Sequence, residues 1–390
     1  MQLMNSKLAS LLTAAAALSG PSLALAQESA EGTRVSYRYS DYDEDALSAT
    51  PLDGSPQRYH IRTQQLTVDT PLAGGMLKAG LTSEVMSGSS PWFLLPDESG
   101  RPLQVMSGAT IKESRQEVSL AWDRDQGGGN GYGFSASYSA ENDYRATSIG
   151  AERRQALTDA LTLGYGGSFS HDVIHPSDAL IFDRIAQDQK NTTSAFISLA
   201  QVLDRSRVLQ AGLQLTHSSG FLSDPYKRFY AGGRFLNDRR PDQRTQAAAL
   251  LRYRHALTTA DAALHADYRY AQDSWGVRSH TIDLAWYQSL GQDWKLIPGI
   301  RFYSQDAASF HAFFSDSQNP GRYYSGDYRL GDYGALSASL DLRKRFGEFE
   351  LVIGIDRYRS SADYALGGSS GDDPGLVSFT QASVGFDFRF

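Results

Sequence analysis

The sequence predicts an all-β fold, a transmembrane antiparallel up-and-down β-barrel of about 16 strands, with roughly 14 to 18 as the acceptable range. Three features indicate it: an export signal at the N-terminus, long segments in which apolar and polar residues alternate, and a last strand that ends in phenylalanine. Each feature lies in a different part of the chain, so each supports the fold separately.

The first 26 residues have the parts of a secretory signal peptide. Lys7 gives a positive start, Leu8 to Leu18 form an apolar core, and Ala24-Leu25-Ala26 is a small-x-small cleavage site. The core is too short to span a membrane as a helix, which needs about 20 residues. We therefore expect residues 1–26 to be removed and residues 27–390 to form one outer-membrane β-barrel domain.

Composition excludes several classes of function. The chain has no cysteine, so it can form neither disulfides nor cysteine-bound metal sites. Its net charge of −7 argues against nucleic acid as a partner. No stretch after the signal approaches 18 consecutive apolar residues, which argues against transmembrane helices. We expect no cofactor and no bound metal.

Apolar and polar residues alternate along most of the remaining chain, as in residues 209–215, 264–270 and 349–355. Strict alternation is typical of strands with two different faces. The segments run for about 10–13 residues, whereas soluble strands average about 5–6 and a tilted membrane strand needs about 9–11. The alternative is a soluble β-sandwich or propeller, but the second face is too polar to form a dry core.

Short and long connections alternate between these segments, as periplasmic turns and external loops do in outer-membrane barrels. Seven turns and eight loops separate 16 strands, so both ends of the barrel are expected on the periplasmic side. The expected turns are Thr70–Gly75, Arg124–Asn130, Leu157–Ala160, Asp204–Arg207, Leu257–Ala260, Leu290–Asp293 and Arg345–Glu348. The expected loops are Asp43–Gln57, Ser87–Thr110, Glu141–Tyr144, Ile174–Lys190, Ser218–Gln243, Asp273–Val277, Ala308–Asp327 and Ser361–Gly375.

The last strand alternates Phe386, Phe388 and Phe390 with polar residues and glycine. This pattern resembles the terminal signal that the barrel-assembly machinery of Gram-negative bacteria reads. We therefore expect that machinery and the lipids of the outer membrane to be partners of the chain.

Charged residues on the polar face must point into the barrel, because a charge facing lipid costs about 2–4 kcal/mol near the midplane. They either set the selectivity of a pore or form a structural network, and the mixture of both signs favours the network for most of them. The expected inward-facing charges are Arg38, Arg115, Glu117, Arg252, Arg254, Asp267, Arg269, Arg301, Arg343 and Asp356.

Two loops differ from ordinary solvated connections. Trp92, Phe93, Leu94 and Leu95 are too apolar for a free loop tip, so they either fold into the lumen as a constriction or form a patch for a partner. We favour the inward fold. A second loop could also cover the barrel, and its candidate residues are Asp224, Tyr226, Arg240 and Asp242.

Enzymatic activity has little support. Ser170-His171 and His217-Ser218 suggest a hydrolase, but neighbours on a strand face opposite sides and cannot form a dyad alone. His171 and His175 would be roughly 13 Å apart on a strand, too far to share a metal unless the chain turns near Ile174. We expect a protein that is not an enzyme.

Several loop motifs resemble a Gram-negative family that is defined as a domain of unknown function. The motifs are Ser87–Phe93, Met106–Ile111, Leu222–Lys227, Arg240-Pro241-Asp242 with Arg244, and Ser325–Leu330. The match spans nearly the whole mature chain in order, and Ser89 stands where the family has alanine.

The resemblance implies an outer-membrane barrel without an established activity. Genes of the family lie near those for a small lipoprotein, a thioredoxin-like protein and a flavin transferase, which implies a lipoprotein partner and a link to envelope redox chemistry. From residues and resemblance together we expect a porin-like channel for transport or the outer-membrane component of an envelope system. The alternative is a scaffold or receptor barrel that holds an envelope partner, and an outer-membrane hydrolase is the least favoured hypothesis.

Overall fold

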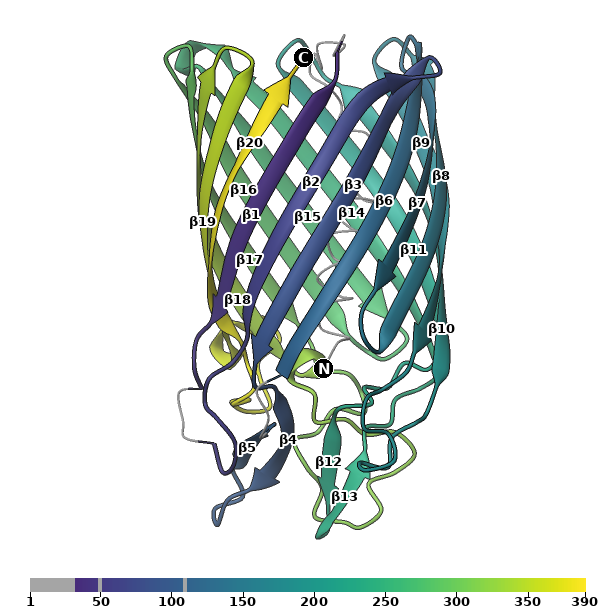
Figure 1. Ribbon diagram of the computed structural model, residues 1–390, viewed down its shortest axis with the longest axis vertical. Coiled ribbons are helices and arrows are strands. Elements are labelled where there is room, and N and C mark those ends of the chain that lie inside the picture. Colours follow the sequence, from purple (N-terminus) through teal and green to yellow (C-terminus); the bar gives the residue numbers. More distant parts are fainter. Residues whose placement is uncertain (1–31, 48–50, 108–110) are drawn as a thin grey trace.

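The computed structural model describes residues 32–47, 51–107 and 111–390. The predicted signal peptide lies outside these residues. Sixteen of the described strands form a closed barrel in which each strand pairs antiparallel with its neighbours (Figure 1). This confirms the predicted fold class and strand number.

The strands follow one another around the barrel in chain order, interrupted only by two small hairpins that lie in loops. Their bounds are β1 Arg34–Glu44, β2 His60–Leu72, β3 Gly75–Gly88, β6 Ile111–Gly127, β7 Asn130–Ala140, β8 Tyr144–Thr158, β9 Leu161–Ile174, β10 Asp188–Val202, β11 Arg207–Gly220, β14 Gln243–Leu257, β15 Ala262–Asp273, β16 Arg278–Leu290, β17 Trp294–Gln305, β18 Tyr333–Phe346, β19 Phe349–Ser361 and β20 Ser378–Arg389.

The first and last strands close the barrel. β1 pairs with β20 from Arg34 opposite Arg389 to Glu44 opposite Phe379, and the backbone N–H of Phe390 donates to the carbonyl of Thr33 at 2.9 Å. Both strands reach the same end of the barrel, where the seven short turns lie (Figure 1). That end is the periplasmic one in the usual pattern of outer-membrane barrels.

The tight turns depend on residues that tolerate a positive φ. In the β6–β7 turn, Gly127, Gly128 and Gly129 have φ values of 82°, 61° and 79°. Residues with side chains rarely adopt this region, so the glycine run fixes the turn that the sequence predicts there.

The two faces of the barrel wall differ as alternation requires. Leu213 and Ile149 are 62 % and 59 % exposed on the outer face, which suits contact with lipid. Polar and charged side chains occupy the inner face at the alternate positions. Among the described residues, no helix is long and apolar enough to cross a membrane.

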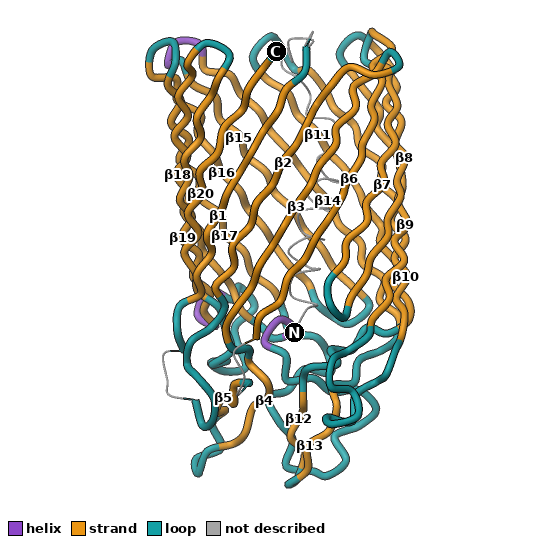
Figure 2. The backbone as a smooth tube through the Cα atoms, viewed as in Figure 1, coloured by secondary structure: helices purple, strands orange, loops and turns teal. Residues whose placement is uncertain are grey.

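Long loops gather at the opposite end of the barrel (Figure 2). Two hairpins lie within them, β4 Pro91–Pro96 with β5 Pro102–Met106, and β12 Arg228–Ala231 with β13 Arg234–Asn237. Short 3-10 turns occur at η1 Thr258–Ala260, η2 Tyr328–Leu330 and η3 Ala362–Tyr364.

The β4–β5 hairpin corrects one expectation. It lies beyond the ends of the barrel strands instead of folding into the lumen (Figure 1). Pairing between β4 and β5 satisfies backbone groups outside the barrel, and Trp92 and Phe93 pack on rings of other loops. The apolar side chains therefore have neighbours without entering the barrel.

Candidate functional site: the cap over the barrel mouth

Loops from distant parts of the wall meet beyond the long-loop end of the barrel. We call residues 51–59, 89–107, 175–187, 221–242, 306–332 and 362–377 the cap. Segment 89–107 joins the third and fourth strands of the barrel, and segment 221–242 joins the ninth and tenth. Despite this separation, the Lys227 ammonium donates to the carbonyl of Pro91, and the rings of Phe93 and Phe235 lie 4.8 Å apart.

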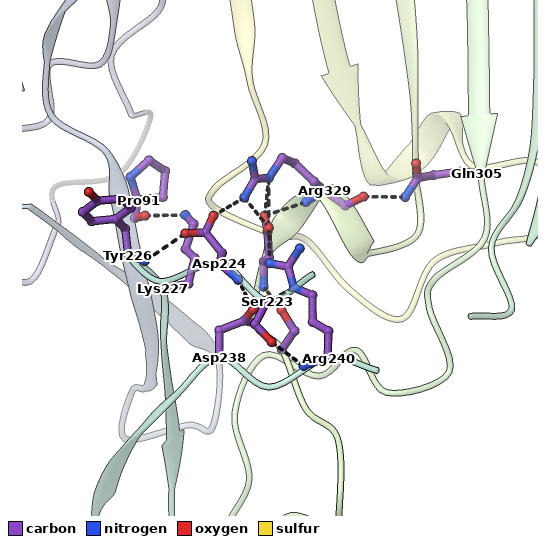
Figure 3. Close-up of polar contacts among 11 residues, drawn as sticks. Pro91, Ser223, Asp224, Tyr226, Lys227, Asp238, Arg240, Gln305 and Arg329 are labelled. Carbon is purple, nitrogen blue, oxygen red and sulfur yellow. Dashed lines mark hydrogen bonds and ion pairs between the residues drawn. The ribbon is translucent and has the colours of Figure 1, made fainter. Parts of the chain in front are cut away.

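A buried ionic cluster joins two of these segments (Figure 3). Arg240 donates from Nε to Asp238 and from Nη2 to Asp327, both at 2.7 Å. Arg329 pairs with the same Asp327 carboxylate and reaches Asp224 at 2.6 Å. The Arg240–Asp327 contact joins residues 87 positions apart, so it fixes segment 221–242 against segment 306–332.

Backbone groups complete the cluster. The N–H of Asp224 donates to Asp238 at 2.8 Å, and the N–H of Arg240 donates to the hydroxyl of Ser223 at 2.9 Å. The amide of Gln305, at the end of β17, donates to the carbonyl of Arg329 (Figure 3). It also donates to the carbonyl of Gly331. The cluster is thereby tied to the barrel wall as well as to both loops.

Burial and charge compete in this cluster. The side chains of Asp327 and Arg240 are 0 % and 2 % exposed. Burial opposes ionisation of Asp327, but Arg329 and Arg240 outweigh it and hold the pKa of Asp327 well below its usual range. At Asp238 burial dominates and raises the pKa despite Arg240. Asp238 therefore depends on Arg240 for its charged form.

A second buried group lies beside the first. Arg58 pairs with Glu44 at 2.7 Å and donates to the carbonyl of Gly375 at 3.1 Å. The cations of Arg58 and Lys227 lie over the ring of Tyr328, at 5.8 Å and 5.6 Å from its centroid. Burial lowers the pKa of Lys227. The loop before β2 and segment 221–242 therefore converge on a ring of segment 306–332, and Arg58 also holds the loop before β20.

The predicted inward charges all lie on the inner face, at positions alternate to exposed apolar residues. Most are paired: Arg38 with Asp387, Arg115 with Glu84 and Glu117, Arg252 and Arg254 with Asp267, Arg301 with Asp283, and Arg343 with Glu350. Within the described residues, Arg269 and Asp356 make no ion pair, and Nε of Arg269 has no hydrogen-bond partner. Pairing on this scale agrees with a structural network for most of these charges.

The loop residues predicted to constrict the lumen or bind a partner lie in different surroundings. Asp224 and Arg240 are members of the cluster, and Tyr226 donates from its hydroxyl to Asp143 near the rim. Leu94 is buried, whereas the side chain of Asp242 is exposed and lies outside the cluster.

Sequence reasoning missed Asp238, Asp327, Arg329 and Lys227 as members of this site. The available signal was the Ser325–Leu330 motif, which carried the resemblance but was not interpreted as a site. Nothing in the spacing of that motif indicated which loop it would contact.

The residues that suggested a hydrolase do not converge. Ser170 donates to Asp172, while His171 contacts Asn191 at 2.8 Å on the other face of β9. Within residues 32–47, 51–107 and 111–390, no group of three or more histidine or acidic side chains could hold a metal ion.

Solved structures share the barrel fold at low sequence identity. CdiB from Acinetobacter baumannii has a TM-score of 0.50 at 10 % identity, covering 92 % of this chain and 60 % of its own. A bacterial polysaccharide outer membrane secretin has a TM-score of 0.48 at 9 % identity, covering 93 % of this chain and 99 % of its own. The Pseudomonas putida toluene transporter TodX has a TM-score of 0.42 at 11 % identity, covering 92 % and 90 %.

No curated protein matches the chain in sequence. A family model described as "Protein of unknown function (DUF3570)" matches residues 8–376. The barrel fold matches that of outer-membrane proteins, which supports the same location for this chain. The chain is an outer-membrane β-barrel, and it belongs to the DUF3570 family.

Proposed function

We propose that the protein is an outer-membrane channel for hydrophilic solutes and that the cap closes its outer mouth at rest. The observation that carries the proposal is the exposure of inward-facing charges halfway along the barrel. The side chains of Arg301 and Asp283 are 51 % and 44 % exposed although they point away from lipid. A lumen packed with side chains would bury them, and barrels of about 16 strands normally enclose an aqueous passage.

The cap supplies the closure. Its segments start on opposite parts of the wall, meet beyond the mouth and are held by buried ion pairs. A buried pair is costly to break from one side, because the remaining charge is left without compensation. Opening requires segments 221–242 and 306–332 to separate, so the ionic cluster sets how often the mouth opens.

Single-channel recording in planar bilayers tests this. We expect rare openings of the wild-type protein and frequent openings of an Arg240→Met variant, with the same current per opening because the lumen is unchanged. Arg278→Gln is the matched control, since it removes an exposed ion pair with Asp306 at the same end. Absence of current from both the wild type and Arg240→Met, with heat-modifiable mobility showing folded barrels, would refute the channel.

A scaffold or receptor that holds an envelope partner, such as a small lipoprotein, is the second candidate. Leu180 and Ile181, in the loop between β9 and β10, are 100 % and 76 % exposed, which favours a contact surface at the cap. A photo-crosslinking residue at Leu180 should then trap a protein in intact cells. The same residue at Leu366, an exposed position in another loop, is the control. No adduct specific to Leu180 would remove this candidate.

A further inference from the structure

An aromatic pocket lies where segments 221–242 and 306–332 meet the loop between β15 and β16, and Pro241 in its lining directly follows Arg240 of the ionic cluster. It has a volume of about 630 Å³, within the range of roughly 300–1,000 Å³ that small-molecule sites occupy. Its lining includes Phe229, Trp275, Phe310, Phe314, Tyr323 and Tyr324.

The walls of the pocket are fixed before any ligand arrives. Trp275 is 3 % exposed, donates from its indole N–H to the carbonyl of Gln243 at 2.9 Å and packs edge-on against Phe310, with centroids 5.3 Å apart. Phe229 is 1 % exposed and packs on Tyr324 at 5.1 Å. The backbones of Tyr324 and Arg239 pair in both directions. A pre-organised site loses little entropy on binding.

The rim of the pocket is polar and open to solvent. Ser309 and Arg322 are exposed, and the half-exposed Tyr323 and Tyr324 have no partner for their hydroxyls among the described residues. Flat apolar ring faces beside free hydroxyls suit the two faces of a sugar ring better than a hydrocarbon, which needs a dry pocket.

Arg322 adds a charge preference. Its guanidinium lies 5.0 Å from the centroid of the Tyr323 ring. It makes no ion pair within the described part of the chain, so its donors are free for a ligand. A guanidinium pairs with a carboxylate through two parallel hydrogen bonds.

We propose that this pocket binds an acidic saccharide unit, whose ring lies against the aromatic side chains and whose carboxylate pairs with Arg322. The site is at the outer end of the barrel, where glycans outside the cell can reach it. The pocket spans the two segments whose separation would open the cap, but its test does not depend on the channel, because binding can be measured in detergent without any current.

Binding of the full chain to a glycan array, followed by isothermal titration with glucuronate and cellobiose, tests the proposal. We expect array hits that contain uronic or other acidic sugars, and tighter binding of glucuronate than of cellobiose. Tyr323→Ala should weaken both by about tenfold. Arg322→Gln should abolish the preference for glucuronate and leave cellobiose unchanged.

Phe235→Ala, which removes an exposed ring of the cap outside the pocket, is the matched control and should bind normally. Benzoate serves as a probe without a sugar ring. No array hit, binding of benzoate alone, or saccharide binding that survives Tyr323→Ala at full strength would overturn the proposal. Each of these results leaves the channel test unaffected.

Discussion

The Arg240→Met variant should open the cap without unfolding the barrel. Arg240 is the link between Asp238 and Asp327, at 2.7 Å from each, and its side chain is 2 % exposed. Asp327 keeps Arg329 when the link is lost, but Asp238 keeps only neutral partners, the N–H of Asp224 and the hydroxyl of Ser325, and its buried Oδ1 has no hydrogen-bond partner. One buried charge is therefore uncompensated, which costs about 3–5 kcal/mol.

That loss raises the open fraction of the cap by roughly 100- to 4,000-fold, at about 1.4 kcal/mol per factor of ten. Hydrogen exchange measured by mass spectrometry should show it in peptides from segments 221–242 and 306–332, while peptides from the barrel strands stay protected.

Adding Asp238→Asn to Arg240→Met should restore much of the protection, because the neutral amide removes the uncompensated charge. Unchanged exchange in the single variant, or no recovery in the double variant, would refute the reasoning that the cluster holds the cap closed.

Three further predictions concern the wall and the cap. Ser337→Cys, opposite Arg301 on the inner face, should react with a charged thiol reagent and reduce single-channel current, whereas Leu336→Cys on the lipid face should not. Leu213→Arg should lower the free energy of unfolding in urea by about 2–4 kcal/mol, whereas Gln214→Arg on the inner face should change it little. Burial raises the pKa of Asp373 to about 7, so the closed cap binds a proton there that the open cap releases. The stability of the cap should fall as the pH rises from about 4 to about 7, by up to about 1.4 kcal/mol per unit, and exchange of cap amides should depend less on pH in Asp373→Asn.

Most of the barrel wall could be predicted to within a few residues because its signals are local, although the loop expected at Ala308–Asp327 extends over residues 306–332. Alternation assigns each side chain to a face, and turn residues end each strand. The expected turn at Arg345–Glu348, for example, overlaps the end of β18 at Phe346 and stops just before β19 begins at Phe349. The three phenylalanines of the C-terminal signal lie in or just after β20, and their role in assembly stays a prediction.

The cap could not be predicted in the same way because its contacts are distant in sequence. Arg329 and Asp224 are 105 positions apart, and neither loop has a period that indicates the other. Apolar residues such as Trp92 indicated that the loop had to pack somewhere, but not whether the partner was the lumen or other loops. The charge of Arg240 did not indicate its position either. An arginine in a loop is solvated in most proteins, whereas Arg240 is buried.

The central claim is that the cap closes an aqueous barrel, and the most direct test is to lock the cap during a recording. The native chain has no cysteine, so Arg239→Cys and Tyr324→Cys introduce the only two thiols, at positions that pair in an antiparallel bridge between segments 221–242 and 306–332. We predict that a short, cleavable thiol crosslinker abolishes the single-channel openings of this variant and that cleaving it restores them. Openings of equal frequency and size before and after crosslinking would contradict the account.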